Sequence, residues 1–279
     1  MKSIFDTVSR DCSKAVTNSY STSFSLASKL LAPSIRQDVY NVYGFVRFAD
    51  EIVDSFHNYD KETLLNDFEE DLKKAVRDKI SLNPILNSFQ ETVHKFNIEE
   101  EFYMSFLRSM RLDLYKSKYL TKEEYEDYIY GSADVVGLMC LKVFVQGNQQ
   151  KFDDLKEDAM KLGSAFQKVN FLRDLKADLE DLNRSYFPNT NLQKLDENSK
   201  KRIIEEIELD FKAGLKGIQR LPVEAKLGVY TAYVYYLRLL HKLKKTPSLE
   251  IRNKRIRVPN YEKAGLMAKS YVTCRLNLL

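Results

Sequence analysis

Residues 163–179 read GSAFQKVNFLRDLKADL, and the spacing of their polar residues is the strongest indication of the fold. Its small and polar residues recur at steps of four, three, four and four positions, which places them along one face of an α-helix. They are Gly163, Gln167, Asn170, Asp174 and Asp178. The positions between them are mostly apolar, so the rest of this helix is expected to be buried. A face of amides and carboxylates inside such a helix must look into something polar, and a water-filled cleft that holds cations and phosphates would serve.

A second acidic stripe lies in residues 45–54, FVRFADEIVD. Asp50 and Asp54 are one helical turn apart, and Arg47 precedes Asp50 by three residues on the same face. Two like charges at this spacing destabilise an exposed helix by about 0.2–0.5 kcal/mol. Charged pairs are common on solvated helices, but the neighbours here are apolar. We therefore expect this face also to line a polar cleft.

Facing pairs of carboxylates suit a divalent cation. Mg²⁺ prefers oxygen ligands, keeps several waters and usually bridges one or two carboxylates to substrate phosphates. Carboxylates one turn apart on each of two facing helices would hold such ions from opposite walls, as in other helical bundles. Arg47 and Arg173 would then contact phosphate oxygens directly. The sequence thus predicts a Mg²⁺ site, with Mn²⁺ as an alternative ion.

Helical periodicity also dominates the rest of the chain. Further helices are expected at residues 34–55, 61–79, 99–116, 121–146, 151–182, 199–218, 222–245 and 261–276. Asn83-Pro84 and Thr121-Lys122-Glu123-Glu124 are helix start signals, and Ser34 is expected to cap the helix after Pro33. Glycine and proline number only 9 and 6, and no alternating strand pattern or low-complexity linker occurs. We predict a single all-α domain that spans residues 1–279.

Composition limits the classes of partner. The chain has 44 Lys and Arg against 40 Asp and Glu, so its net charge of +4 does not require a nucleic acid, and none is expected. The three cysteines are far apart, which excludes a disulfide framework or a zinc cluster. No apolar run reaches the ~18 residues of a membrane span, and the N-terminus lacks the apolar segment of a secretory signal. We expect a cytoplasmic protein that is at most peripheral to the inner face of the membrane.

Five elements, in order along the chain, resemble those of the squalene/phytoene synthase family. Residues 21–24 are similar to its Ser-x-Ser-Phe element, and residues 50–54 and 167–178 to its two aspartate-rich motifs. Residues 130–137 resemble its Tyr-Gly-x-Ala-x-x-Val-Gly helix, and residues 184–188 its Arg-x-Tyr-Phe-Pro element. A single aspartate pair would be weak evidence, whereas five ordered elements are specific. The resemblance implies a helical bundle of the isoprenoid synthase type with a central cavity.

The resemblance also implies roles for individual residues. Four would hold Mg²⁺ against the diphosphates: Asp50, Asp54, Asp174 and Asp178. Five would act in catalysis or line the reaction chamber: Tyr130, Gln167, Asn170, Arg173 and Tyr186. Six would bind substrate: Ser21, Ser23, Phe24, Arg47, Arg184 and Tyr236. One departure is Tyr20, which stands where many relatives have histidine and affects only the substrate mouth.

The implied reaction is the head-to-head condensation of two prenyl diphosphates. Two geranylgeranyl diphosphates would give phytoene through prephytoene diphosphate, a step of carotenoid biosynthesis that needs no NADPH. Squalene or dehydrosqualene formation from two farnesyl diphosphates stays open, because the motifs do not fix the depth of the cavity. A non-catalytic lipid-binding or assembly factor is an alternative of another class, which retention of both aspartate pairs disfavours. The Arg-x-Tyr-Phe-Pro element and the paired aspartate spacing disfavour a head-to-tail prenyltransferase or a terpene cyclase.

A basic segment lies near the C-terminus. Residues 238–257 contain eight Lys and Arg with little acid nearby in the sequence. One hypothesis is that this segment attracts diphosphate groups or an anionic membrane surface from which an oily substrate enters. The alternative is a solvated helix end and loop. The sequence indicates no oligomeric state.

Overall fold

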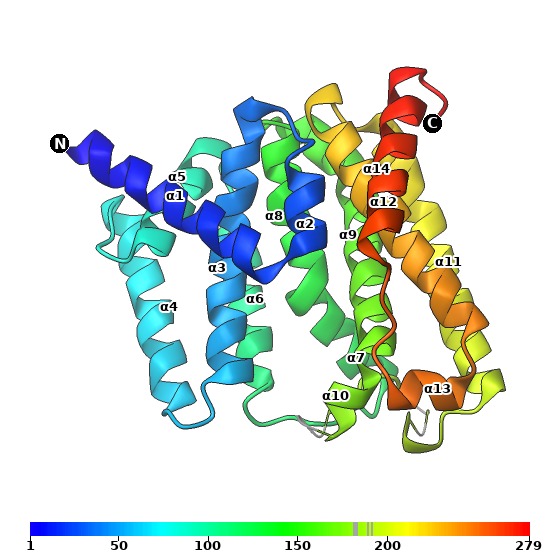
Figure 1. Cartoon of the computed structure of the whole chain (residues 1–279). Coiled ribbons are helices and arrows are strands. Elements are labelled where there is room, and N and C mark those ends of the chain that lie inside the picture. The colour runs from blue at the N-terminus through cyan, green and yellow to red at the C-terminus, as the bar shows by residue number, and fades with distance from the viewer. Residues whose placement is uncertain (181–183, 189, 191) are drawn as a thin grey trace.

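The chain folds as a bundle of helices (Figure 1). The computed structural model describes residues 1–180, 184–188, 190 and 192–279, with the side chains of Asp178, Glu180 and Gln193 left out of the description. The elements are α1 (Lys2–Tyr20), α2 (Thr22–Ser28), α3 (Pro33–Ser55), α4 (Lys61–Asp78), α5 (Pro84–Phe96), α6 (Glu100–Leu112), α7 (Lys122–Ile129), the π-helix η1 (Tyr130–Asp134), α8 (Val135–Phe144), α9 (Gln149–Arg173), α10 (Leu175–Glu180), the 3₁₀ turn η2 (Leu192–Lys194), α11 (Glu197–Arg220), α12 (Val223–Lys245), α13 (Ser248–Asn253) and α14 (Asn260–Arg275). Extended pairing in this part of the chain is limited to one isolated bridge, between Lys118 and Ser185. The predicted all-α class is confirmed.

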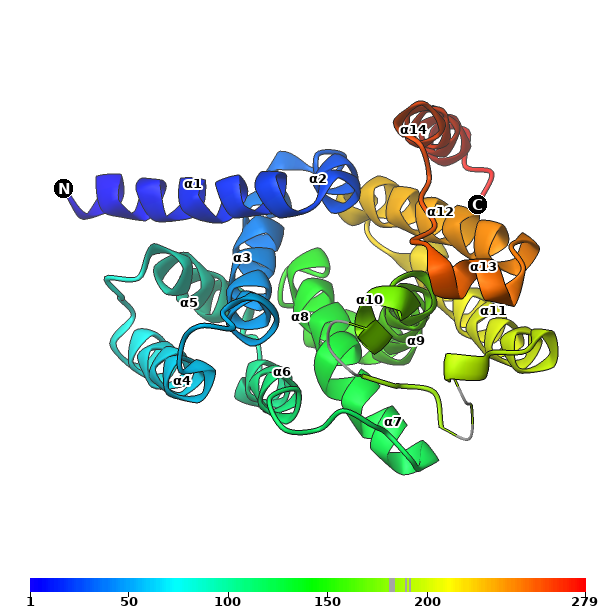
Figure 2. The same ribbon diagram turned by 60° about the horizontal axis from the view of Figure 1, so that its bottom comes forward.

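The long helices run side by side around a central region. Figure 2 shows α2, α3, α8, α9 and α12 arranged as a ring, with α11 packed outside α9. α1 lies across α3 and α5, and α14 packs on the outside of α12. This arrangement turns one face of each ring helix inward.

A cluster of phenylalanine rings joins α3 to its neighbours. Phe45, Phe89 and Phe106 are fully buried, and the Phe45 ring lies 4.1 Å from that of Phe89 and 5.7 Å from that of Phe106. Burial of each ring contributes about 1.5–3 kcal/mol. The cluster holds the apolar face of α3 against α5 and α6, which leaves its acidic face free to line the interior.

Two of the helix start signals act as predicted. Asn83 Oδ1 accepts hydrogen bonds from the amides of Ile85 and Leu86, and α5 begins at Pro84. Thr121 Oγ1 accepts from the Glu124 amide at 3.2 Å and opens α7. The prediction for Ser34 is wrong, because α3 begins at Pro33 after Ala32, without a side-chain cap.

Helix α1 was not expected from the sequence, because polar residues form its buried face. Ser9, Ser13 and Thr17 are fully buried there. The hydroxyl of Ser13 lies 2.7 Å from that of Ser88 on α5, so the contact is made by hydrogen bonds between small side chains. A search for apolar periodicity cannot find such a face.

The helix expected at residues 121–146 is interrupted and ends early. α7 widens into η1 at Tyr130 and continues as α8, which ends at Phe144. The backbone of η1 lies against α6, since a Cβ on Gly131 would come within 2.8 Å of the Ser105 carbonyl oxygen. π-Turns of this kind are rare and occur mostly near functional sites.

The helix expected at residues 151–182 is also broken. α9 ends at Arg173 and α10 begins at Leu175, because Asp174 leaves the helical conformation with φ −98° and ψ 10°. Residues 181 and 182, the predicted end of this helix, lie outside the described residues. Asp174 therefore sits at a corner of the chain.

The contact between α9 and η1 leaves no room for a side chain at Gly163. A Cβ there would lie 2.8 Å from the Ala133 carbonyl oxygen, which is a backbone atom that cannot move freely. We expect Gly163→Ala to lower the free energy of unfolding by about 1–3 kcal/mol. Urea denaturation of the purified variant measures this change.

Gly265 in α14 provides the matched control. A Cβ at this helical glycine meets nothing within 4 Å. Gly265→Ala should leave stability unchanged or raise it by up to about 1 kcal/mol. Equal stability of the two variants would contradict the close approach of α9 to η1.

Candidate active site

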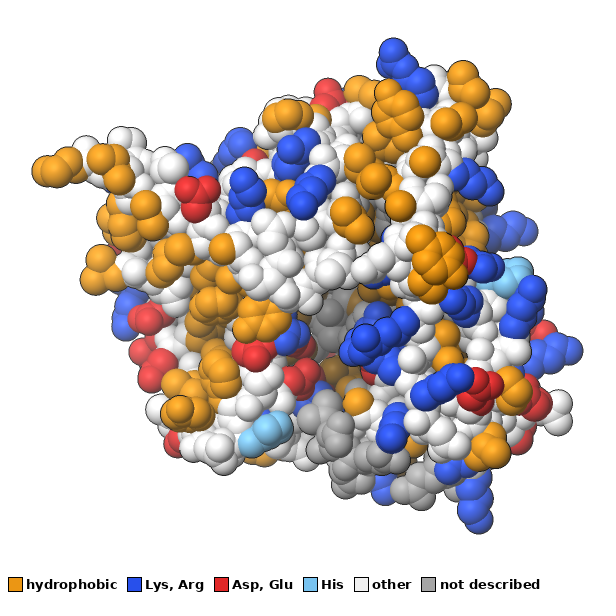
Figure 3. All heavy atoms as spheres, viewed as in Figure 1, with side chains coloured by type: hydrophobic (Ala, Val, Ile, Leu, Met, Phe, Trp, Pro, Cys, Tyr) orange, Lys and Arg blue, Asp and Glu red, His pale blue; other side chains and the backbone are white. Residues whose placement is uncertain are grey.

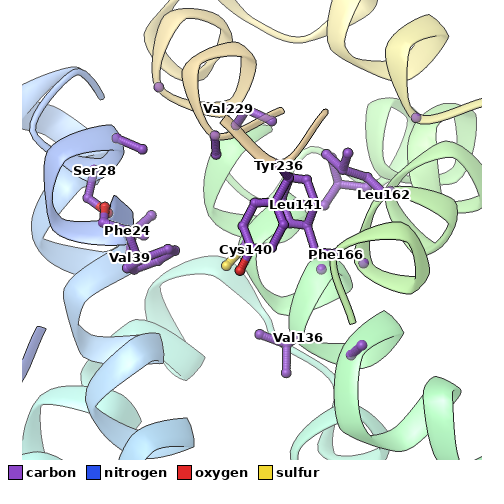
Figure 4. A pocket seen from close by; sticks show the side chains of 18 of the residues that line it. Phe24, Ser28, Val39, Val136, Cys140, Leu141, Leu162, Phe166, Val229 and Tyr236 are labelled. Atoms are coloured by element: carbon purple, nitrogen blue, oxygen red, sulfur yellow. The ribbon is translucent and has the colours of Figure 1, made fainter. Parts of the chain in front are cut away.

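An apolar chamber of about 390 Å³ lies inside the ring of helices. Its walls come from α2, α3, α8, α9, α11 and α12. Figure 4 shows part of this wall, with the labelled residues Phe24, Ser28, Val39, Val136, Cys140, Leu141, Leu162, Phe166, Val229 and Tyr236. Such a lining is suited to a long hydrocarbon chain rather than to a polar ligand.

A second cavity of about 260 Å³, here called the acidic pocket, adjoins the chamber. Its lining includes four carboxylates and two guanidinium groups: Asp50, Asp54, Asp113, Asp174, Arg47 and Arg184. Both cavities are lined by Tyr43, Val46, Ser132, Gln167 and Asn170, so these residues form their junction. Figure 3 shows a hollow in one face of the molecule, with acidic side chains on one rim and basic side chains on the other. The molecule thus offers a charged compartment next to an apolar one.

The first wall of the acidic pocket is the inward face of α3. Arg47 donates hydrogen bonds to Asp50 and Glu51, and its guanidinium lies 4.4 Å from the centre of the Tyr20 ring. Burial, together with the nearby charge of Asp54, raises the pKa of Asp50 to about 7. Because burial and the charge of Asp54 make ionisation of Asp50 unfavourable, a bound cation would stabilise the ionised carboxylate.

The second wall carries the amide residues of α9. Tyr236 donates to Asn170 at 3.3 Å, Asn170 donates to Gln167 at 3.3 Å, and the Gln167 amide lies 3.5 Å from the Ser132 hydroxyl. The Tyr236 ring stacks on Phe166 with centroids 4.2 Å apart. This chain of hydrogen bonds fixes the polar groups at the junction of chamber and pocket.

Asp174, at the corner after α9, is held by two arginines. Arg173 Nε donates to it at 3.0 Å, and Arg255 Nε, from the segment between α13 and α14, lies 2.7 Å away. The C-terminal part of the chain therefore reaches across to the acidic pocket. The side chain of Asp178, the fourth predicted metal ligand, lies outside the described residues.

Arg184 and Tyr186 enter the pocket from the segment that follows α10. Arg184 donates to Asp54 at 2.9 Å. Tyr186 is buried and stacks on Phe171 with ring centroids 3.8 Å apart. The structure thus brings both residues of the Arg-x-Tyr-Phe-Pro element to the acidic side chains.

The Ser-x-Ser-Phe element lines the chamber beside the junction. Ser21 caps α2 by accepting from the Phe24 amide at 3.2 Å, and Ser23 lies in the same wall. The Phe24 ring stacks on Tyr43, with centroids 4.7 Å apart.

The structure corrects the prediction for Tyr130. This residue lines neither cavity, and its hydroxyl lies 3.3 Å from Glu101. Tyr128 lines the acidic pocket instead. Two residues correspond to about 200° of helical turn, so the two tyrosines point to different sides.

Sequence reasoning also missed Asp113. It lies just after α6, a common place for a surface aspartate, and no periodic partner marks it. In the structure its side chain is only 4% exposed, and Tyr128 donates to it at 2.8 Å. Burial raises the pKa of Asp113 to about 7, against the opposing charge of Arg184.

The residues present fit a Mg²⁺ ion. No group of three or more acidic, histidine or cysteine side chains converges to hold a metal within the described part of the chain. Mg²⁺ usually takes only one or two carboxylates and completes its shell with water and phosphate oxygens. Asp50, Asp54 and Asp174 line one pocket and meet this requirement.

The basic segment, residues 238–257, has little acid nearby in the sequence, but in the fold several of its Lys and Arg side chains contact acidic residues. Arg238 and Lys242 both contact Glu262, and Lys244 lies 2.6 Å from Glu208. Lys254 pairs with Glu250, and Arg255 with Asp174. Among the described residues, no helix combines the length and apolarity needed to cross a membrane.

Comparison with known proteins agrees with this fold. The family model for squalene/phytoene synthase matches residues 17–262. A chloroplastic phytoene synthase 2 of Zea mays is 31% identical over 61% of this chain but only 42% of its own length, so the chain spans less than half of that protein. The 15-cis-phytoene synthase of Synechocystis sp. is 27% identical over 90% of this chain and 80% of its own. A dehydrosqualene synthase of known structure, 21% identical, superposes with a TM-score of 0.81 over 97% of this chain and 98% of that one.

The bundle therefore has the isoprenoid synthase fold, as predicted. The chain belongs to the squalene/phytoene synthase family, whose members are prenyltransferases.

The shifted carboxyl group of Asp50 makes stability depend on pH. Because its pKa rises from 3.8 to about 7 on folding, the folded protein binds this proton more tightly than the unfolded chain does. Without divalent ions, this group should lower stability as the pH rises from about 4 to about 7, and its effect should then level off. Asp50→Asn should therefore melt above the wild type at pH 8, with a smaller difference at pH 5. Thermal melts in chelator test this, and a difference independent of pH would contradict it.

Proposed function

We propose that this chain condenses two molecules of geranylgeranyl diphosphate head to head to phytoene, through prephytoene diphosphate. The observation that carries the proposal is the junction of two unlike compartments. An apolar chamber for prenyl chains opens onto a pocket with four carboxylates and two arginines. An allylic diphosphate has this same division between an oily chain and an anionic head.

The acidic pocket is suited to take the departing diphosphate. Asp50, Asp54, Asp174 and Asp178 would hold Mg²⁺, which when bound offsets the negative charge of the diphosphate as the carbon–oxygen bond breaks. Arg47, Arg173 and Arg184 would donate to phosphate oxygens, because guanidinium groups match their geometry. These arginines already lie beside the carboxylates, so little rearrangement is required.

The chamber is suited to hold the allylic cation that remains. Its walls are mostly apolar and include aromatic rings, among them the stacked pairs Phe24–Tyr43 and Phe166–Tyr236. A ring face stabilises a desolvated cation by about 0.5–2 kcal/mol. The double bond of the second substrate attacks this cation and, with loss of a proton, forms prephytoene diphosphate.

The second half of the reaction uses the same compartments. Loss of the second diphosphate, rearrangement and loss of another proton give phytoene without any reductant. Two geranylgeranyl diphosphates thus yield one phytoene, two diphosphates and two protons. The phytoene synthases among the relatives support the C20 substrate.

The decisive experiment incubates purified protein with Mg²⁺ and labelled geranylgeranyl or farnesyl diphosphate, with and without NADPH. Mass spectrometry of the extract should show phytoene, a C40 hydrocarbon with a central conjugated triene, from the C20 substrate alone, independent of NADPH. Asp54→Asn and Asp174→Asn should each lower kcat by roughly 100-fold or more, since they remove charge that binds the ion. Asp71→Asn on the exposed face of α4 is the matched control and should leave kcat unchanged.

Other products would change the conclusion. A C30 hydrocarbon would indicate dehydrosqualene formation, or squalene formation if NADPH were required. Prenyl alcohols alone would contradict the condensation. Binding of substrate without turnover would favour a lipid-binding factor on this fold.

A further inference from the structure

One carboxylate in the lining of the acidic pocket, that of Asp113, has no role in the chemistry described above. The Asp113 side chain is only 4% exposed, and its Oδ1 has no hydrogen-bond partner. The other oxygen, Oδ2, accepts from Tyr128 at 2.8 Å. Leaving a buried carboxylate oxygen unpaired is costly, so another interaction must compensate for its charge.

The cation that faces this oxygen is Arg184. Its Nε lies 3.9 Å from Asp113 Oδ1, and its Nη2 donates to the Asp113 backbone carbonyl at 3.1 Å. The Nη1 on the other branch donates to Asp54 at 2.9 Å. The Arg184 guanidinium thus spans from a buried aspartate to an aspartate whose side chain is one-third exposed in the pocket.

The two carboxylates differ in what else they can bind. Asp54 faces the cavity, so a cation or diphosphate that enters can draw it away from Arg184. Asp113, whose side chain is only 4% exposed, is enclosed by Tyr119, Tyr128 and Arg184 and stays beside the guanidinium. A buried arginine with only one exchangeable partner would lose its position when that partner turned to the ligand.

We propose that Asp113 is a positioning residue that anchors Arg184 against the diphosphate site while Asp54 engages the ligand. Tyr128 orients the Asp113 carboxylate through its hydroxyl. This inference rests on the proposed function, because it assigns Arg184 to the diphosphate of that reaction.

The first test is Asp113→Asn, measured at pH 8. Asparagine keeps the size, the backbone carbonyl and an acceptor for Tyr128, and it removes only the charge. We expect kcat to fall roughly 10- to 100-fold, with KM changed by less than about threefold, as for other groups that orient a ligand-binding side chain. Calorimetry with inorganic pyrophosphate and Mg²⁺ should show binding weakened by about tenfold, independent of turnover.

A double-mutant cycle separates positioning from structure. If Asp113 acts through Arg184, the double variant Asp113→Asn/Arg184→Gln should lose no more activity or pyrophosphate affinity than Arg184→Gln alone. A merely structural role predicts that the two losses multiply. Tyr128→Phe removes only the hydrogen bond that orients Asp113 and should lower kcat by a smaller factor, about threefold to tenfold. This variant replaces Asp113→Asn in the test if Asp113→Asn does not fold.

Asp134→Asn is the matched control. Asp134 is also a packed carboxyl group whose pKa burial raises to about 7, but it accepts from Ser164 and lines neither cavity. The Asp134→Asn variant should retain the wild-type kcat and the wild-type affinity for pyrophosphate.

The outcomes separate the two proposals. Wild-type pyrophosphate affinity in Asp113→Asn, multiplying losses in the cycle, or no Mg²⁺-dependent pyrophosphate binding by the wild type would each overturn the role of Asp113. Failure of the wild type to turn over either prenyl diphosphate would overturn the proposed function alone, since the calorimetric cycle still decides whether Asp113 anchors Arg184.

Discussion

Repulsion among the carboxylates that share one pocket shapes this structure more than any other interaction. Asp50, Asp54, Asp113 and Asp174 line a cavity next to an apolar chamber, where water cannot screen their charges fully. An arginine lies beside each of these carboxylates. Arg47 contacts Asp50, and Arg184 lies between Asp54 and Asp113. Arg173 and Arg255 contact Asp174. These cations come from α3, the end of α9 and two segments that follow, so balancing the charge also ties distant parts of the chain together.

The packing of the helices fixes the positions of both the carboxylates and the arginines. The phenylalanine cluster around Phe45 binds the outer face of α3, which leaves Asp50 and Asp54 facing inward. The end of α9 at Arg173 sets Asp174 at a corner that Arg255 can reach. Interruptions of regular helix thus occur where the site needs a change of direction, at η1 and at Asp174.

Local patterns in the sequence predicted many of these features correctly. The spacing of polar residues from Gln167 to Asp174 identified the inward face of α9, and Asn83 and Thr121 marked two helix starts. Patterns failed where burial is polar or the helix is irregular. The buried face of α1 is made of Ser9, Ser13 and Thr17, so apolar periodicity does not reveal this helix. The family resemblance pointed to Tyr130, whereas Tyr128, two residues earlier and on another side of the helix, lines the pocket. The role of Asp178 stays a prediction.

The helical class and the two acidic stripes could be predicted from the amino-acid sequence, because both follow from residue spacing within a few helical turns. The pairing of charges could not, because it depends on the packing of the helices. Asp113 and Arg184 are 71 residues apart, and Asp174 and Arg255 are 81 apart. Such partners are chosen by how helices pack in three dimensions, and no local period in the chain records that choice.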